Sequence, residues 1–197
     1  MYKAAPFHNY RVFTTEYMQS ACANLHCKLR LANIVGAMLP DFASGSIRCK
    51  LYRLAGFQIH DSAFIMGNLE LNGGGDDFYR NLRIGPGVVI GTHVTINLDA
   101  EVCIDTNVAI GPHVLIYTAT HPIGPGSSRR LGPVVAKPVT IEKGAWIGLG
   151  AILLPGVTVG HGSIVAAGAV VSTDVPPDSY VEGNPAQVTR QLPWGDR

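Results

Sequence analysis

The sequence predicts a mainly β protein, a parallel β-helix preceded by an N-terminal helical segment. An aliphatic residue returns every six positions along most of the chain. In addition, 20 of the 23 glycines and 30 of the 34 Val and Ile residues follow residue 56. The 197 residues are 47% hydrophobic and only 15% charged. This composition provides enough apolar surface for a packed core and is unlike that of a disordered chain.

Residues 1–56 are expected to form an N-terminal helical cap. Apolar residues in this segment recur at the three- and four-residue steps of an amphipathic helix. They are Leu25, Leu29, Ile34 and Met38. A second, short helix is predicted over residues 46–54. Its basic residues Arg48, Lys50 and Arg53 are expected to line a solvated face.

Residues 57–175 carry the six-residue repeat. The repeated positions are Ile84, Ile90, Ile96, then after a two-residue slip Ile104, Ile110, Ile116, and finally Ile141, Ile147, Leu153, Val159, Val165 and Val171. A period of six fits neither an amphipathic helix nor a long alternating strand, but it fits short strands joined by tight turns. Three such strands make one triangular coil, and stacked coils form a parallel β-helix.

Two segments depart from the repeat. Residues 118–138, rich in Gly, Pro and Ser, are predicted to form an excursion loop. After residue 175 the chain leaves the repeat through two prolines, and the tail 176–197 is expected to pack on the coils. The domain prediction is therefore a cap, a β-helix with one excursion, and a tail.

Charge and cysteine content exclude several classes of function. Residues 1–56 contain 7 Lys/Arg and 2 Asp/Glu, a net charge of +5, whereas the remainder has a net charge of −4. Neither part has the basic runs of a nucleic-acid-binding protein.

An apolar signal core and a membrane span are also missing, so a cytoplasmic protein without membrane insertion is expected. The cysteines are expected to be free, mostly buried thiols in a reducing compartment; they are Cys22, Cys27, Cys49 and Cys103.

Six motifs occur in order between residues 117 and 186. They are YTATHP at 117–122, KPVTI at 137–141, AWIG at 145–148, LLPGVTVG at 153–160, AAGAVV at 166–171 and GNPA at 183–186. Together they resemble the hexapeptide-repeat O-acetyltransferases, especially the maltose, galactoside, nodulation-factor and exopolysaccharide acetyltransferases. The resemblance covers about residues 57–192. It implies a left-handed coil and an acetyl-CoA-dependent transfer to a hydroxyl of a sugar or glycan-like acceptor.

His121 is the predicted catalytic residue, because the resemblance places it in the active-site segment. A sugar hydroxyl is too weak an acid to attack a thioester unaided. A histidine, whose ordinary pKa lies near 6.5, can accept the hydroxyl proton during the attack and then protonate the departing thiolate. The resemblance implies acetyl-CoA as co-substrate and no metal. The alternative for His121 is a turn histidine that stacks on Pro122.

The acceptor-binding residues are predicted to be Asp99, His93 and Asn97. Aligned without gaps back from His121, Asp99 takes the position of an acceptor-binding aspartate of the galactoside-type enzymes. Two asparagines of those enzymes fall on Gly91 and His93. Asn97 is the candidate to replace these asparagines in binding the acceptor. Regular coils would, however, place Asn97 one face of the triangle away from them. The alternative for Asp99 is a turn aspartate that bonds to its own backbone.

The resemblance also implies a coenzyme A groove between neighbouring subunits of a homotrimer. The residues predicted to bind the cofactor are Trp146, Gly148, Leu149, Ala167, Ser172, Thr173, Gln187 and Arg190. Thr173 and Gln187 fall where the family often has basic residues. Coenzyme A is therefore expected to bind more loosely, or Lys137, Lys143 or the arginines at 129–130 compensate.

Two alternatives remain for the function. A metal enzyme like the γ-class carbonic anhydrases has the same architecture, and His93, His113 and His121 are its candidate ligands. That class needs two histidines five residues apart, and this chain has no such pair. A non-catalytic trimeric scaffold is the other alternative, and the presence of His121 argues against it.

Overall fold

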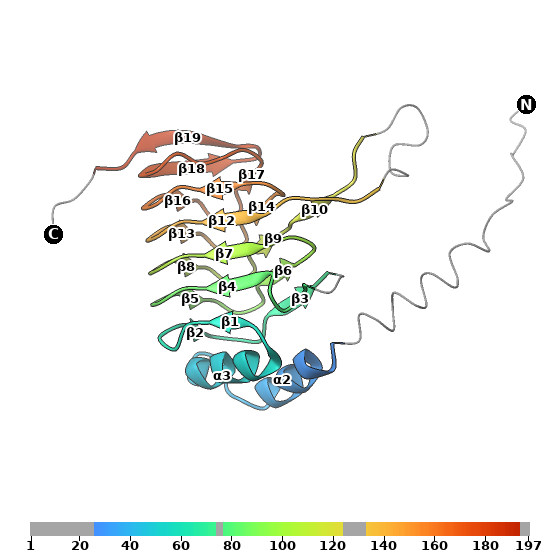
Figure 1. Ribbon diagram of the computed structural model, residues 1–197. Coiled ribbons are helices and arrows are strands. Elements are labelled where there is room, and N and C mark those ends of the chain that lie inside the picture. Colours follow the sequence, from blue (N-terminus) through green and yellow to red (C-terminus); the bar gives the residue numbers. More distant parts are fainter. Residues whose placement is uncertain (1–25, 74–76, 124–132, 194–197) are drawn as a thin grey trace, which may run out of the picture.

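The computed structural model describes residues 26–73, 77–123 and 133–193. Short strands stack in parallel into three sheets, which form the three faces of a triangular prism (Figure 1). We name these faces sheets A, B and C in the order in which the chain visits them. Two helices lie across one end of the prism.

Each sheet takes one strand from every coil. Sheet A contains β1 (Gln58–Ile59), β4 (Leu82–Ile84), β7 (Val102–Ile104), β12 (Val139–Ile141) and β15 (Thr158–Val159). Sheet B contains β2 (Phe64–Ile65), β5 (Val89–Ile90), β8 (Ala109–Ile110), β13 (Trp146–Ile147), β16 (Ile164–Val165), β18 (Ser179–Gly183) and β19 (Ala186–Gln191). Sheet C contains β3 (Glu70–Asn72), β6 (Thr95–Asn97), β9 (Leu115–Ile116), β14 (Ile152–Leu153) and β17 (Val170–Val171).

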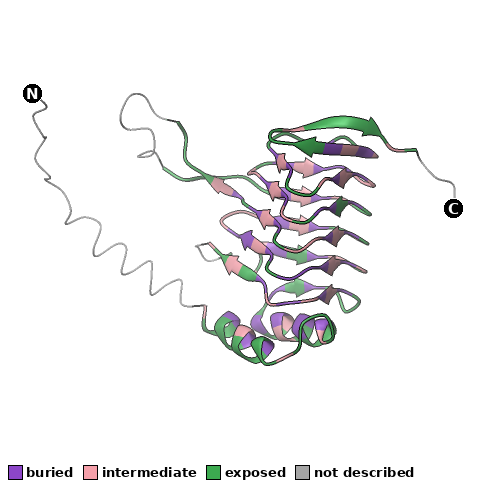
Figure 2. Ribbon diagram, turned by 180° about the vertical axis from the view of Figure 1, so that it is seen from behind, coloured by how far each residue is buried: buried purple, intermediate pink, exposed green. Residues whose placement is uncertain are grey.

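The repeated aliphatic residues form the interior of the prism, which confirms the predicted repeat. In sheet A, for example, Ile104 lies in register between Ile84 and Ile141 of the neighbouring coils. Every repeated residue from Ile84 to Val171 is at most 3% exposed. Burial of such a side chain stabilises the fold by about 1.5–3 kcal/mol. Figure 2 shows buried positions along the strands of every coil, whereas exposed positions dominate β19.

The cap contains α2 (Cys27–Ala37) and α3 (Gly45–Ala55), so the second predicted helix is present with one more residue at each end. The expectation for Arg48 is wrong, because its side chain is only 1% exposed. Its guanidinium donates hydrogen bonds to the carbonyls of Leu39 (2.7 Å) and Met66 (2.9 Å) and pairs with Asp41 (3.1 Å). The Leu39 carbonyl lies just beyond the end of α2 and lacks a helical partner, and this buried cation satisfies it.

Tyr52 attaches α3 to both of its neighbours. Its hydroxyl donates to Oδ1 of Asn33 on α2 and accepts from the backbone N–H of Leu69 in the first coil, both at 2.8 Å. Burial raises the pKa of this phenol to about 12. The cap is therefore joined to the β-helix through a neutral, buried hydrogen-bonded group.

The excursion and the tail contain further strands. β10 (Ala119–Thr120) and β11 (Val135–Ala136) pair antiparallel at the root of the excursion. The arginines at 129–130 lie outside the described residues. In the tail, β18 pairs in parallel with β16, and β19 returns antiparallel to β18. The tail thus extends sheet B at the end of the prism opposite the cap (Figure 1).

The described cysteines are free thiols in different surroundings. Cys49 is buried, Cys103 is half-buried and Cys27 is exposed on α2. The expectation of mostly buried thiols therefore holds for Cys49 and is wrong for Cys27. Cys22 lies outside the described residues.

Candidate active site

Three predicted site residues lie near one corner of the prism, where the chain turns from sheet C to sheet A. Asn97 ends β6, Asp99 lies in the turn that follows, and His121 follows β10 one coil later. The two-residue slip in the repeat is this turn between β6 and β7. We call this the C–A corner.

Partly buried hydrogen bonds hold Asn97 and Asp99 together. The Asn97 amide donates to the Asp99 carboxylate (3.0 Å) and to Oδ1 of Asn72 (3.0 Å). The fully buried hydroxyl of Thr118 lies 2.6 Å from Oδ1 of Asn97 and accepts from the backbone N–H of Ala100 at 3.1 Å. Asn97 is therefore in direct contact with Asp99, and its amide is oriented by neighbours on three coils.

Thr118 also ties His121 to this corner. It lies three residues before the histidine, and its carbonyl accepts from the backbone N–H of Lys137 at 2.7 Å. Thr118 thus links the start of β10 and the end of β11 to the turn that contains Asp99. His121 itself is exposed, so its imidazole is accessible to a substrate from solvent.

His93 lies at a different corner, between sheets B and C, which we call the B–C corner. Its imidazole stacks on that of His113 one coil further along, with 4.9 Å between the ring centroids and 12° between the planes. Both residues have positive φ, +55° and +58°. The whole of β6 separates His93 from Asp99, so one copy of the chain does not bring the three predicted acceptor residues together.

Gly91 at the same corner has no room for a side chain. A Cβ atom there would lie 2.6 Å from the backbone nitrogen of Pro112 in the next coil. An asparagine side chain of the galactoside-type enzymes therefore has no equivalent at this position. The close approach of two coil backbones therefore leaves space only for glycine at position 91.

Part of the predicted cofactor surface lies further along the B–C corner. Gly148 and Leu149 follow β13, and Ala167 follows β16 in the next coil. A Cβ at Gly148 would lie 2.6 Å from the nitrogen of Ala167, so the backbones here are tightly stacked. Trp146 and Leu149 are each 55% exposed. They give this surface an apolar character that suits a pantetheine arm.

The other predicted cofactor residues lie elsewhere. Ser172 and Thr173 follow β17 at the C–A corner, and both are exposed. Gln187 and Arg190 lie on β19, where the Arg190 guanidinium stands 4.3 Å from the centroid of the Tyr180 ring. The predicted donor surface is thus divided between two corners and the terminal hairpin.

Thr118 and Asn72 are site residues that the sequence patterns did not single out. Thr118 belongs to the YTATHP motif, so its place in that motif could have marked it as a candidate site residue. Asn72 had none, because its role depends on the register that pairs it with Asn97. Within the described ranges, no group of three or more His, Cys, Asp or Glu side chains is placed to hold a metal ion.

Comparisons with known proteins agree with this architecture. Residues 138–173 match the family model described as bacterial transferase hexapeptide (six repeats). The galactoside O-acetyltransferase of Lactococcus lactis is 35% identical over 135 residues, which are 68% of this chain and 63% of that protein. Nodulation protein L of Rhizobium meliloti is 50% identical over 110 residues, 53% of this chain and 60% of that protein.

A solved structure extends the similarity to nearly the whole chain. The hexapeptide-repeat acetyltransferase of Vibrio cholerae, in complex with acetyl coenzyme A, has 30% identity and a TM-score of 0.71, with 92% of each chain covered. By contrast, the matched segments span only 56% to 63% of the first curated relatives. The structural likeness confirms the predicted fold, a left-handed parallel β-helix.

Proposed function

Because this chain belongs to the hexapeptide-repeat acetyltransferase family, we propose that it is an acetyl-CoA-dependent O-acetyltransferase acting on a hydroxyl of a sugar or glycan-like acceptor. The observation that carries the proposal is the Thr118 network. It joins the segment that bears His121 to the carboxylate of Asp99, a group that binds hydroxyls well. The acetyl coenzyme A in the Vibrio cholerae structure and the galactoside in the name of the Lactococcus lactis relative support the same chemistry.

In this mechanism His121 is the general base. Its imidazole takes the proton of the acceptor hydroxyl while the hydroxyl oxygen attacks the thioester carbonyl. The new C–O ester bond replaces the C–S bond, and His121 returns the proton to the coenzyme A sulfur. The transfer is direct, since the sequence has no Ser or Cys in an evident nucleophile arrangement.

Asp99 and Asn97 have different roles at the acceptor side. Asp99 accepts hydrogen bonds from acceptor hydroxyls, and its carboxylate is half-buried. The Asn97 amide is already committed to Asp99 and Asn72, so Asn97 is a positioning residue. His93, at the B–C corner, reaches an acceptor bound at the C–A corner only from a neighbouring copy.

The division of the site between corners supports a homotrimer. His121 lies at the C–A corner, whereas Trp146, Leu149 and Ala167 lie on sheet B and the B–C corner. We propose a closed threefold arrangement in which the C–A corner of one copy lies against the B–C corner of the next. Asp99 and His93 belong to the second coil, and Leu149 and Ala167 to the fourth and fifth. Acceptor and donor therefore approach His121 from opposite directions along the prism.

The test compares His121→Ala with His60→Ala, another exposed histidine, on the first coil. Release of free coenzyme A thiol is followed with a panel of sugar acceptors. His121→Ala is expected to lower the rate by about 100- to 10,000-fold, and His60→Ala to leave it unchanged. Equal thermal melting midpoints verify that both variants fold. Unchanged turnover in His121→Ala overturns its catalytic role, and a wild type that acetylates none of the hydroxyl acceptors overturns the activity.

A further inference from the structure

The helix α2 is apolar on the side that faces away from the β-helix. Its residues Leu29, Ala32 and Gly36 are buried against the coils and α3. On its outer side, Leu31, Ile34 and Met38 are 63%, 64% and 82% exposed. Their spacing places them on one stripe of the helix. Within residues 26–73, 77–123 and 133–193, which the structure describes, only one of the two apolar faces of α2 is therefore covered.

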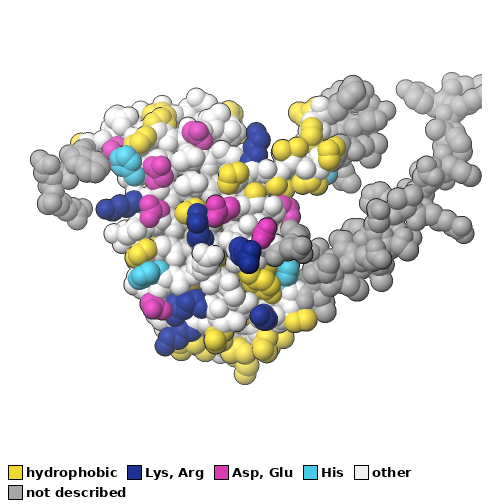
Figure 3. Space-filling view, in the orientation of Figure 1, with side chains coloured by type: hydrophobic (Ala, Val, Ile, Leu, Met, Phe, Trp, Pro, Cys, Tyr) yellow, Lys and Arg dark blue, Asp and Glu magenta, His cyan; other side chains and the backbone are white. Residues whose placement is uncertain are grey.

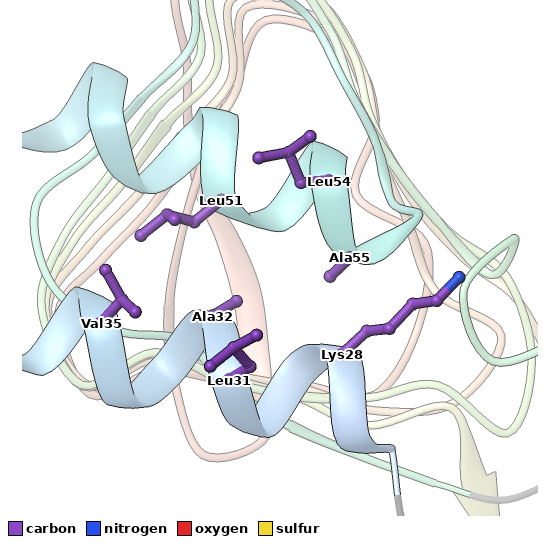
Figure 4. A pocket seen from close by; sticks show the side chains of 7 residues that line it. All are labelled: Lys28, Leu31, Ala32, Val35, Leu51, Leu54 and Ala55. Atoms are coloured by element: carbon purple, nitrogen blue, oxygen red, sulfur yellow. The ribbon is translucent and has the colours of Figure 1, made fainter.

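The helix α3 continues this outer apolar surface. Ile47 and Leu54 are 49% and 80% exposed, and the half-buried Leu51 lies between them at helical spacing. The side chains of Leu51 and Leu54 face those of Leu31 and Val35 across a groove of about 230 Å³ between the helices (Figure 4). We call the exposed apolar residues of α2 and α3 the cap face. Large contiguous apolar surfaces of this kind mark sites of interaction.

Basic side chains accompany the cap face. Lys28, Arg30 and Lys50 are exposed, and in the described part of the chain none of them forms an ion pair. Residues 26–56 contain five Lys/Arg and one Asp/Glu, whereas the chain after residue 56 has a net charge of −4. Hydrophobic atoms gather at this end of the molecule, with Lys and Arg close by (Figure 3). The charge favours a partner that is anionic.

We propose that the cap face docks onto an anionic lipid surface. The exposed Leu, Ile and Met side chains enter the boundary between headgroups and acyl chains, and the lysines lie at the level of the lipid phosphates. None of the described helices is long and apolar enough to span a bilayer. In the proposed arrangement α2 and α3 lie in the plane of the interface. Two cap faces in contact would bring like charges together, which disfavours a second copy as the occupant.

The experiment measures co-sedimentation of the full chain with vesicles of phosphatidylcholine alone or of an equal mixture with phosphatidylglycerol. Wild type is expected to bind the mixture at least about tenfold more tightly than phosphatidylcholine alone. Lys28→Gln and Lys50→Gln each weaken this binding about fivefold. The double variant Leu31→Ser/Leu54→Ser loses binding to both vesicles. Val188→Ser, which changes a solvent-accessible valine on β19 (50% exposed), is the control and keeps this binding.

Several outcomes overturn the proposal. They are no binding to either vesicle, equal binding to both, or equal loss in the Val188→Ser control. If wild type binds no vesicles and Leu31→Ser/Leu54→Ser lowers the mass in solution, a second copy is the occupant and the lipid surface is excluded. The lysine variants change exposed side chains only, so they test the proposal even if the leucine variant misfolds. Vesicle binding does not depend on acetyl transfer, so the result is independent of the proposed activity.

Discussion

At the scale of single residues, the hydroxyl of Thr118 connects two turns that lie one coil apart. It meets the side-chain carbonyl of Asn97 and the backbone N–H of Ala100, and no part of Thr118 is exposed to solvent. Removal of this hydroxyl takes a hydrogen-bond partner from the Asn97 side-chain carbonyl and from the Ala100 N–H, both at a buried position. The loss of stability is therefore larger than for a hydrogen bond at the surface. The position of Asp99 depends on the same group, since Asn97 bonds to both.

Thr118→Val is expected to lower the free energy of unfolding by about 1–3 kcal/mol, because valine has the same shape but no hydroxyl. The transfer rate is also expected to fall under conditions in which the variant is fully folded, since Asn97 no longer orients Asp99. Denaturant unfolding and initial rates measure the two effects. Thr106→Val, which removes a hydroxyl bonded to the exposed Asp105, is the control. Wild-type stability in Thr118→Val would contradict the role given to this network.

At the scale of elements, the turns of the β-helix need glycine for two different reasons. At Gly160, directly after β15, a Cβ would lie 2.5 Å from the backbone nitrogen of Pro177. At Gly144, before β13, a Cβ would meet nothing within 4 Å, but φ is +70°. The first position requires glycine because two backbones are in contact, and the second because the backbone is left-handed.

Gly160→Ala is therefore expected to be more destabilising than Gly144→Ala. The second substitution costs about 1–2 kcal/mol for the left-handed conformation alone. The first must move the backbone of the neighbouring turn, which side-chain rotation cannot relieve. Thermal unfolding of the two variants measures the difference. Equal losses of stability would mean that the turn of Pro177 yields easily and that close approach does not select glycine here.

At the scale of the whole molecule, the separation of the corners has a consequence for assembly. His121 belongs to the C–A corner, and Ala167 belongs to the B–C corner two coils further along the prism. One chain cannot fold these two corners onto each other, because the stacked sheets between them are rigidly hydrogen-bonded. A site that needs both residues must therefore be formed by two copies.

Mixed oligomers test this consequence. His121→Ala lacks the proposed base, and Ala167→Trp blocks the proposed donor surface, so each variant alone is expected to be inactive. Co-expressed in equal amounts, they should regain roughly a quarter of the wild-type rate, because that share of random neighbours unites an intact His121 with an intact Ala167. Coenzyme A thiol release measures it. Absence of any recovery, with mixed oligomers verified by mass, would place the whole site within one copy.

The repeat and the core were determined by the sequence alone. A six-residue period decides which side chain of each short strand points inward, and this is a local property of strand and turn. All predicted repeat positions from Ile84 to Val171 are accordingly buried. The second helix of the cap was also predicted, and Gly56, the left-handed residue that caps it, is a local signal for its end.

The tertiary structure alone decided which corner each site residue occupies and what it touches there. Thr118 and Asn97 are 21 residues apart, and their contact depends on the register between coils. Arg48 was expected at the surface because a helix places charges there by default, but carbonyls from Leu39 and Met66 surround it. His93 was grouped with Asp99 because both fall on acceptor-binding positions of the galactoside-type enzymes, although β6 carries them to different corners. Such contacts arise from the packing of distant segments, which no local pattern records.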